Sequence, residues 1–348
     1  MEFSKSLIHW YLQHKRDLPW RKTTGAYPIW LSEIMLQQTR VAQGLPYFLR
    51  FMEAFPTVQD MASAPEEQVL KLWQGLGYYS RARNLHATSK QVAYEMDGKF
   101  PDSYAGLLKL KGVGDYTAAA IASISYGEAV PVVDGNVYRV LSRVFGVDTD
   151  ISSGGAKKQF TELAASLMPK KQASEFNQAM MEFGALQCVP KSPDCGICIF
   201  NADCVAYNTG RVGQLPVKLK KTKVTNRYFN YIVVKDSRGF SVVQKRTAKG
   251  IWHNLYEFPL LETQSLISEE EAVQGIQNFE GLGFVPTDIK LLNNEVIVHK
   301  LSHQHLYIRF WEVVTNEQVN GAVAVDVLKA FPFPIVIHNF MEKHWSDN

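Results

Sequence analysis

Long apolar runs are missing from this sequence of 348 residues. No stretch reaches the about 18 apolar residues that indicate a membrane-spanning helix. The first residues, MEFSKSLIHWYLQHKRD, mix charged side chains among the apolar ones, whereas a secretory signal peptide places an apolar segment after a basic one. The sequence therefore predicts neither a membrane span nor a signal peptide, and a cytoplasmic location is expected.

Net charge and cysteine are also scarce. The 37 Lys and Arg residues and 34 Asp and Glu residues leave a formal charge of +3. This total does not by itself indicate a nucleic-acid partner, because a basic patch on one face matters more. The cysteines are only four: Cys188, Cys195, Cys198 and Cys204. Such clustering indicates a metal site in a reducing compartment, since the cysteines of a disulfide framework are dispersed.

What is present predicts two globular domains. The composition, 46% hydrophobic and 20% charged, is that of a folded protein, and the length suits two cores. Residues 1–208 repeat apolar side chains at helical spacing and predict an all-α domain, with helices starting near Pro28 and Asp115. Residues 209–226 are rich in Gly, Pro and Lys and predict a linker. Residues 227–348 predict an α+β domain, in which YFNYIVV and FSVVQKR are two strands joined by DSRG, and SEEEAVQGIQNF is a helix with a capping box.

The four cysteines are spaced C-x6-C-x2-C-x5-C. Thiolates at this spacing can converge on one centre, and both zinc and iron-sulfur clusters take thiolate ligands. Structural zinc sites usually pair two C-x2-C units, and only one such unit is present here. The spacing therefore predicts a metal centre and leaves the metal open.

Two further signals precede the cysteines. Gly112, Val113 and Gly114 predict a tight turn between helices, whose bare backbone N–H groups could approach a phosphate, although such a turn is more often an ordinary helix connection. Asp134 follows an apolar run and precedes Gly135 and Asn136. An isolated Asp at such a junction would by default cap a helix.

Taken in order, these features resemble the helix-hairpin-helix superfamily of DNA glycosylases that includes endonuclease III. Within it, LPWR at 18–21, SEIMLQQTR at 32–40, WQGLGYYSRARNLH at 73–86 and VVDGNVYRV at 132–140 resemble the adenine DNA glycosylase (MutY) family. The resemblance covers most of residues 10–208 and continues more weakly beyond. It implies two helical lobes with a cleft between them and a 4Fe-4S cluster on the four cysteines, which serves structural support, DNA docking and redox signalling. Base excision repair is the implied process.

Adenine leaves readily only when the base is protonated, so its removal needs an acid. Glu33 lies among Ile29, Trp30, Ile34, Met35 and Leu36, and this apolar setting should raise its pKa toward neutrality. Asp134 is the expected anion that faces the positive charge on the sugar, as in the two-carboxylate glycosidases. The resemblance adds Asn136 as a polar partner of Asp134 and Tyr116 as a residue near the sugar.

Tyr116 bears on the type of reaction. In the endonuclease III branch this position holds a lysine that attacks the sugar and cleaves the strand through a Schiff base. Tyrosine cannot form an imine, so a monofunctional hydrolase is expected, with weak adventitious cleavage through Lys109 or Lys111. The rivals are an endonuclease III-like bifunctional glycosylase and AP lyase, and a non-catalytic iron-sulfur protein that only binds lesions.

The expected partner is duplex DNA with adenine opposite 8-oxoguanine or guanine, bound by a monomer that associates with the nucleoid. The target base must leave the stack to be reached. By resemblance, Gln38 and Tyr78 enter the duplex near the opposite base. The hairpin residues Gly112, Val113 and Gly114 are also expected to bind DNA. The adenine pocket would consist of Trp20, Arg21, Leu36 and Glu182, although Trp20 and Leu36 are equally well explained as core residues.

The C-terminal domain resembles the Nudix-like domain that this family uses to recognise 8-oxoguanine. GIWHNLYEFP at 250–259 carries the resemblance, while SEEEAVQGIQNF lacks the carboxylate pattern with which a Nudix hydrolase binds magnesium. The family's lesion-sensing loop reads Phe-Ser-His, and here Leu301, Ser302 and His303 occupy it. The leucine places more of the discrimination on Ser302 and His303. Although His299, His303 and His305 could also suggest a metal, exposed histidines of a hairpin are the commoner explanation.

Overall fold

The structure is a computed structural model that describes residues 2–219 and 223–345. The chain divides into two compact units, a helical unit of Met1–Ala64 and Arg83–Lys220, and a mixed unit of Pro65–Ala82 and Lys221–Asn348. A segment of the N-terminal half thus groups with the C-terminal half. The domain boundaries expected from the sequence, at 208 and 227, stay predictions. Across the described residues, no helix has both the length and the apolar character that a membrane crossing requires.

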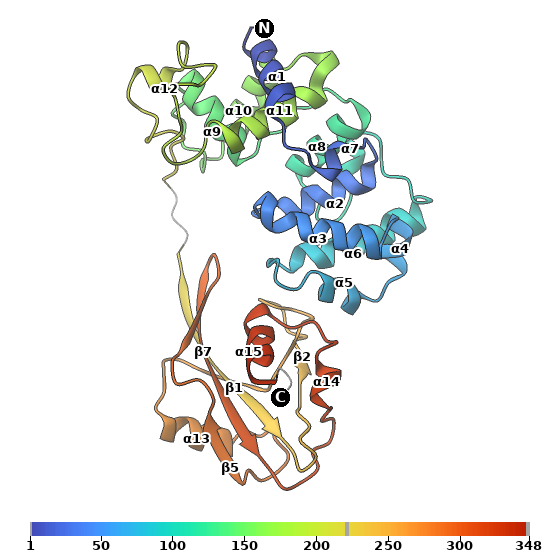
Figure 1. Ribbon diagram of the computed structural model, residues 1–348, viewed down its shortest axis with the longest axis vertical. Helices are drawn as coiled ribbons and strands as arrows, with labels where there is room; N and C mark the ends of the chain where they lie inside the picture. The colour runs from blue at the N-terminus through green and yellow to red at the C-terminus, as the bar shows by residue number, and fades with distance from the viewer. Residues whose placement is uncertain (1, 220–222, 346–348) are drawn as a thin grey trace. The chain divides into compact units, whose positions relative to one another are not determined.

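The helical unit forms two lobes (Figure 1). The α-helices whose bounds lie mainly in it are α1 (Glu2–His14), α2 (Ala26–Leu36), α3 (Val41–Ala54), α4 (Val58–Ser63), α6 (Ser80–Glu95), α7 (Tyr104–Leu107), α8 (Asp115–Tyr126), α9 (Gly135–Phe145), α10 (Ala156–Leu167), α11 (Ala173–Leu186) and α12 (Val205–Asn208), with 3-10 turns at Pro19–Arg21 and Lys170–Gln172. One lobe gathers α1 and α9 to α12, and the other gathers α2 to α4, α6, α7 and α8. The expected all-α architecture is confirmed.

The side chains of α8 and α9 explain how these two helices are buried. α9 buries Val137, Val140, Leu141 and Val144, which recur every three or four residues and so share one face. α8 buries every residue from Thr117 to Ser123, which marks it as a central helix. Four of these are alanines, and their small side chains leave room for α2 and α11 on either side. Both α8 and α9 end at a glycine with positive φ.

The mixed unit is built on a five-stranded sheet of order β4-β1-β7-β5, with β6 also paired to β7. β1 (Thr225–Lys235) runs parallel to β7 (Gln304–Val314), whereas β4 (Leu260–Thr263), β5 (Asp288–Leu291) and β6 (Ile297–Lys300) pair antiparallel. The remaining elements are α5 (Glu66–Leu72), β2 (Gln244–Lys245), β3 (Tyr256–Glu257), α13 (Glu269–Gln277), α14 (Val325–Leu328) and α15 (Ile335–Trp345). The expected α+β class is confirmed.

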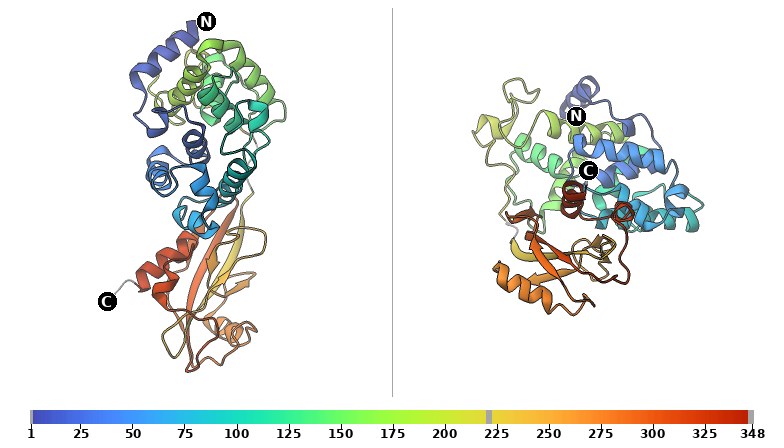
Figure 2. Two further views of the ribbon diagram at one scale, coloured as in Figure 1. Left: turned by 90° about the vertical axis from the view of Figure 1, so that its right-hand side faces the viewer. Right: turned by 60° about the horizontal axis from the view of Figure 1, so that its bottom comes forward.

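Helices cover both faces of this sheet, which explains the continuous apolar run of β1. On one face, Ile232 packs with Ala272 and Ile276 of α13. On the other face, Tyr231 stacks on Phe310, and Phe310 stacks on Phe340 of α15 at 3.7 Å between ring centroids. α13 and α15 lie on opposite sides of the strands in Figure 1 and in Figure 2.

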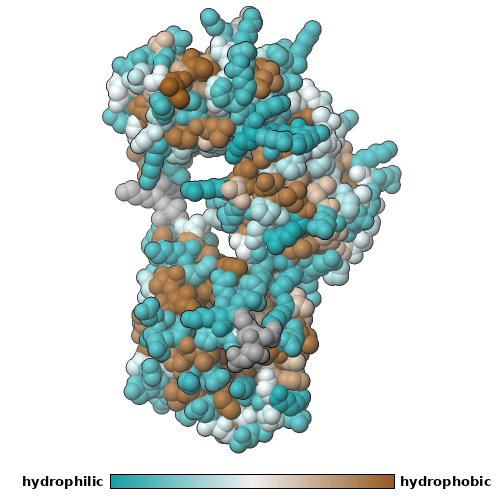
Figure 3. Space-filling view, viewed as in Figure 1, coloured by the Kyte–Doolittle hydropathy of each residue, from teal (hydrophilic) through white to brown (hydrophobic). Residues whose placement is uncertain are grey.

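Two details of the mixed unit test the sequence patterns. The capping box of Ser268 and Glu271 is present at the start of α13. The strand expected over FSVVQKR is wrong in most of its length, because only Gln244–Lys245 forms a strand, which pairs with β3, and Ser241 forms an isolated bridge with Val323. β1 pairs along its whole length with β7, and its residues Tyr228–Tyr231 also pair with β4. On the face shown in Figure 3, hydrophilic side chains predominate on both units, and apolar ones form separate patches.

Candidate active site

A cleft of about 1270 Å³ opens in the helical unit and is lined by residues of both lobes. Its lining brings together all the residues expected for catalysis and for the adenine pocket, with two of those expected to bind DNA, namely Glu33, Tyr116, Asp134, Asn136, Trp20, Arg21, Leu36, Glu182, Gln38 and Gly114. The other expected DNA-binding residues, Tyr78, Gly112 and Val113, do not line it. Residues that are about a hundred positions apart in the chain thus share one cavity.

Glu33 lies on α2 with only 7% of its surface exposed. Burial is the main reason that the pKa of its carboxyl rises from 4.5 to about 7. The hydrogen bond from Tyr116 lowers this pKa, the charge of Asp134 raises it, and the charge of Arg21 lowers it. The sequence-based expectation of a pKa near neutrality is therefore confirmed. A carboxyl with this pKa holds a proton at neutral pH and can still release it, as a general acid must.

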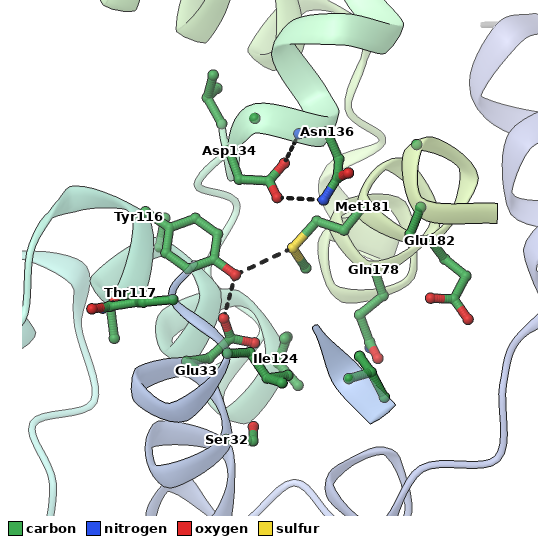
Figure 4. A pocket seen from close by; sticks show the side chains of 18 of the residues that line it. Ser32, Glu33, Tyr116, Thr117, Ile124, Asp134, Asn136, Gln178, Met181 and Glu182 are labelled. Atoms are coloured by element: carbon green, nitrogen blue, oxygen red, sulfur yellow. Dashed lines mark hydrogen bonds between the residues drawn. The ribbon is translucent and has the colours of Figure 1, made fainter. Parts of the chain in front are cut away.

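Tyr116 fixes the position of that carboxyl. Its hydroxyl donates to Oε2 of Glu33 and lies 3.6 Å from Sδ of Met181, as Figure 4 shows. Burial raises the pKa of Tyr116 well above its usual value. The phenol therefore stays protonated and keeps the hydrogen that it donates to Glu33.

Asp134 is the N-cap of α9. Its Oδ1 accepts from the backbone N–H groups of Asn136 and Val137 at 2.9 and 2.8 Å, and its Oδ2 accepts from Nδ2 of Asn136 at 2.7 Å. Burial raises the pKa of Asp134, while these three bonds oppose the rise. Capping and exposure to the cleft are thus properties of one side chain, although they looked like alternatives in the sequence.

Glu182 shows the opposite electrostatic situation. Its carboxylate is 1% exposed and accepts five hydrogen bonds, three from Arg16 and two from Arg21, at 2.6 to 2.9 Å. Burial raises the pKa of Glu182, but the two guanidinium groups outweigh it and lower the value to about 2. Arg16 also lines the cleft, and sequence reasoning missed it. The signal was its place in KRDLPWR, directly before the LPWR motif.

Trp20 and Leu36 were each expected either to line the pocket or to belong to the hydrophobic core. Trp20 is 8% exposed and packs edge to face on Phe48 at 5.0 Å, yet it lines the cleft. Leu36 is half-buried at the end of α2 and lines it too. Each residue therefore belongs to both the packing and the cavity wall.

Two of the residues expected to enter the duplex have a rare backbone conformation. Gln38 has a φ of 55° and Tyr78 a φ of 49°, in the left-handed region that non-glycine residues seldom adopt. Strain of this kind persists where surrounding contacts hold it and is common at functional sites. In the hairpin, Gly112 has a φ of 74°, and a Cβ there would approach Cβ of Asn84 to 2.7 Å. The turn therefore requires glycine at 112, while Gly114 caps α8.

The lysine that lines the cleft is not one of the two expected from the sequence. Neither Lys109 nor Lys111 lines the cleft, whereas Lys157 of α10 does. Its Nζ lies 2.6 Å from Oδ2 of Asp115, and Oδ1 of the same carboxylate accepts from the Tyr104 hydroxyl at 2.9 Å. This lysine was not singled out from the sequence, because nothing in its immediate neighbours marks it.

The four cysteines line one small cavity beside α9 and the end of α11. Among the residues that the structure describes, no three His, Cys, Asp or Glu side chains are arranged to hold a single metal ion. Burial raises the pKa of the Cys198 thiol to about 11, so a thiolate there needs a bound cation. Four thiols around one cavity fit a cluster of several metal atoms, each bound by one of them.

Two arginines of α9 tie this loop to the cleft. Arg143 donates to the carbonyls of Val189, Pro190 and Leu215. Nε of Arg139 donates to the carbonyl of Cys188 at 2.7 Å, and its Nη2 donates to Oδ1 of Asn136 at 2.9 Å. Because Asn136 in turn donates to Asp134, hydrogen bonds connect the first cysteine with the half-buried carboxylate of Asp134.

Leu301, Ser302 and His303 form the turn between β6 and β7 in the mixed unit. Ser302 and His303 are exposed, and Ser302 Oγ lies 3.1 Å from Nδ1 of His303. Leu301 closes the turn by donating its N–H to the carbonyl of Gln304. His299 packs its ring against Trp252, so exposure alone does not explain it. No described histidine belongs to a metal-binding group.

Known proteins match both units. Residues 31–166 match the HhH-GPD superfamily of base excision DNA repair proteins, and residues 230–343 match the NUDIX domain. The adenine DNA glycosylase of Buchnera aphidicola subsp. Schizaphis graminum is 35% identical over 309 residues, which cover 88% of this chain and 86% of that protein. The adenine DNA glycosylase of Homo sapiens is 46% identical over 213 residues, 59% of this chain and 39% of that protein. A solved thermostable thymine-DNA glycosylase aligns with a TM-score of 0.54 and 28% identity, covering 60% of this chain and 95% of its own.

Proposed function

The chain belongs to the adenine DNA glycosylase family of base excision repair enzymes, and we propose that it removes adenine opposite 8-oxoguanine or guanine in duplex DNA. The observation that carries this proposal is the pair of carboxyls in one cleft, with Glu33 buried and Asp134 half-buried. Glu33 has its pKa raised to about 7, and Asp134 is held by three N–H groups. One carboxyl suits proton donation, and the other suits stabilisation of positive charge.

In the proposed reaction, Glu33 donates its proton to the adenine ring as the N-glycosidic bond breaks. The bonding electron pair leaves with the base, so the base departs neutral and the sugar becomes positively charged. Protonation by a placed acid accelerates such steps by about 10² to 10⁴-fold. Tyr116 keeps the carboxyl oriented, because its hydroxyl donates to Oε2 of Glu33.

Asp134 then faces the positive charge that develops on the sugar, and water supplies the hydroxyl that completes hydrolysis. Its Oδ2 bond to Asn136 and its Oδ1 bonds to the start of α9 favour the ionised form. Both oxygens are held by N–H groups, so Asp134 keeps a fixed orientation. Asn136 is proposed as the residue that maintains it.

The adenine pocket is proposed to include Trp20, Arg21, Leu36 and Glu182. Glu182 and its two arginines supply fixed acceptors and donors at the cleft wall. Trp20 and Leu36 supply apolar surface against which a flat base can pack. Such a wall combines apolar contact with hydrogen-bonding groups, as ligand pockets do.

Strand cleavage is not part of the proposal. Tyr116 occupies the position at which a lysine would form an imine, and a phenol cannot do so. Lys157 is the lysine that lines the cleft, and its ammonium is paired with Asp115. We expect it to give at most slow adventitious trapping with the abasic product.

The four cysteines are proposed to hold a 4Fe-4S cluster. Their shared cavity fits such a group, with Cys204 buried and the other three half-buried, and Arg143 anchors the loop that carries them. The bound cluster would supply structural support, DNA docking and redox signalling. The residues of the loop would hold it next to α9, whose first turn contains Asn136.

Recognition of the opposite base is proposed for Ser302 and His303, with Leu301 as an aliphatic contact, and for Gln38 and Tyr78 as residues that enter the duplex. The hairpin of Gly112 to Gly114 would hold a phosphate. The protein would act as a monomer in the cytoplasm, associated with the nucleoid through DNA. The domains would be a glycosylase domain (1–208), a linker (209–226) and a Nudix-like domain (227–348).

The proposal is tested with duplexes that place adenine opposite 8-oxoguanine, guanine or thymine. Base release is measured as strand breakage after alkali, and we expect release from the first two duplexes and little from the third. Absence of release from adenine opposite 8-oxoguanine would refute the proposed substrate. Efficient covalent capture with borohydride would favour a bifunctional enzyme instead. Binding without release would favour a non-catalytic lesion-binding protein.

A further inference from the structure

The segment 65–82, which carries Tyr78, belongs to the mixed unit although it lies within the N-terminal half of the chain. It consists of α5, a loop and the start of α6. At the near end, Glu66 accepts from Asn254 at 2.6 Å, and Glu67 accepts from Lys245 and Tyr256 at 3.0 and 2.8 Å. These contacts fix where α5 begins.

The far end of the segment is held by residues 329–333, which we name the strap. Nζ of Lys71 donates to the carbonyls of Lys329 and Phe331 at 2.6 and 3.2 Å. Phe333 contributes both of its backbone polar groups: its N–H donates to Oε1 of Gln74 at 3.0 Å, and its carbonyl accepts from the Tyr79 hydroxyl at 3.3 Å. Gln74 and Tyr79 flank the loop 75–78, so one residue of the strap grips both sides of that loop.

The strap is itself firmly anchored. The carbonyl of Pro332 accepts from the N–H of Tyr256 at 2.9 Å, and Phe331 stacks on the Tyr256 ring at 4.6 Å. Phe333 is 1% exposed. Prolines at 332 and 334 fix φ at these positions and favour extended backbone before them. The strap is therefore a stiff part of the C-terminal half of the chain.

The loop 75–78, which the strap contacts, has an unusual backbone conformation. Gly75, Gly77 and Tyr78 all have positive φ. The carbonyl of Gly77 accepts from Nε1 of Trp73 at 3.0 Å and from Nη2 of Arg81 at 3.1 Å. The Tyr79 hydroxyl closes the loop by accepting from the N–H of Gly75 at 3.3 Å. Only Tyr78 points outward, with 45% of its surface exposed.

We propose that the strap positions Tyr78 for its contact with DNA, so that Phe333, Gln74 and Tyr79 are positioning residues for recognition of the opposite base. The left-handed conformation of Tyr78 needs surrounding contacts to persist, and the strap supplies them through Gln74 and Tyr79. The C-terminal half of the chain thereby acts on DNA recognition at a second place besides residues 301–303. This inference rests on the proposed function for the role of Tyr78.

The test is a double-mutant cycle on the full chain. Tyr79→Phe removes the hydroxyl that bridges Gly75 and Phe333 and keeps the ring. Binding is measured to a duplex with 8-oxoguanine opposite a 2′-fluoro adenine nucleoside, which resists cleavage of the glycosidic bond. We expect a dissociation constant about fivefold higher, the size of one lost hydrogen bond. In the Tyr78→Ala background, the same change should have less than a twofold effect, because residues that act through one another are not additive.

Two comparisons separate positioning from a general structural effect. Tyr126→Phe removes a hydroxyl that donates to the Phe100 carbonyl at 3.2 Å in the helical unit, and it should leave binding unchanged in both backgrounds. Gln74→Met removes the acceptor of the Phe333 N–H and should resemble Tyr79→Phe, whereas Gln74→Glu keeps an acceptor and should bind like the parent protein.

Equal effects of Tyr79→Phe with and without the Tyr78 side chain would overturn the proposal, as would an unchanged dissociation constant for both Tyr79→Phe and Gln74→Met. The substrate assay is independent of this result. A parent protein that binds the duplex but releases no adenine would refute the proposed function, while the cycle would still report on the strap.

Discussion

Replacing Glu33 by glutamine should inactivate the enzyme and stabilise it. The folded state raises the pKa of this carboxyl from 4.5 to about 7, so folding favours the protonated form. Its contribution to stability is therefore complete below pH 4.5 and is lost as the pH rises through about 7. Since one pKa unit corresponds to about 1.36 kcal/mol, ionisation of Glu33 costs about 3 kcal/mol at pH 8 and about 1 kcal/mol at pH 5.5. Glutamine has no charge to lose and avoids this cost at both pH values.

The melting temperature at these two pH values reports the difference. For a unit of roughly 200 residues, 1 kcal/mol shifts the midpoint by about 2 to 4 °C, so Glu33→Gln should melt about 6 to 12 °C higher at pH 8 and about 2 to 4 °C higher at pH 5.5. Glu182→Gln is the matched comparison in the same cleft. Because its pKa is lowered to about 2 by Arg21 and Arg16, neutralising it should destabilise the protein at both pH values. A gain for Glu33→Gln that is equal at the two pH values would refute the assigned pKa.

Three further predictions concern the reaction. The single-turnover rate of adenine release should fall about tenfold per pH unit above about pH 7. Tyr116→Phe should move this decline to higher pH, because the hydrogen bond that it removes lowers the pKa of Glu33. A decline at unchanged pH would contradict the contact. Asp134→Asn should lower the rate at least about 10²-fold with unchanged circular dichroism, because asparagine still caps α9; a normal rate would exclude a role for the charge. Cys198→Ser should abolish the visible absorbance of the cluster and reduce both the melting temperature and the rate, and normal values of all three would exclude a cluster at this site.

The sequence predicts the local features well. Glu33 could be identified as buried because its apolar neighbours occupy adjacent turns of one helix, and α9 could be placed because Asp134 and Gly135 form a helix start. Long-range pairings could not be predicted in this way. The ion pair of Arg16 and Glu182 joins residues 166 positions apart. The sequence around either residue does not indicate its partner.

The same limit explains the errors in the mixed unit. FSVVQKR has a strand-like composition, yet its residues pair with distant parts of the chain, Gln244 and Lys245 with β3 and Ser241 with Val323. Residues 65–82 are joined to this unit by hydrogen bonds such as those that the Phe333 N–H donates to Gln74 and the Phe333 carbonyl accepts from Tyr79. A backbone carbonyl and N–H leave no mark in a sequence, so such contacts become visible only in the structure.

The cleft also shows how one residue type takes two protonation states a short distance apart. Glu33 and Glu182 are both buried glutamates, yet burial raises the pKa of the first to about 7, while two guanidinium groups lower that of the second to about 2. The charge of Arg21 lowers the pKa of Glu33 as well, but both of its Nη atoms donate to Glu182. Glu182 therefore holds the guanidinium of Arg21, whose charge opposes the effect of burial on the pKa of Glu33 without overcoming it.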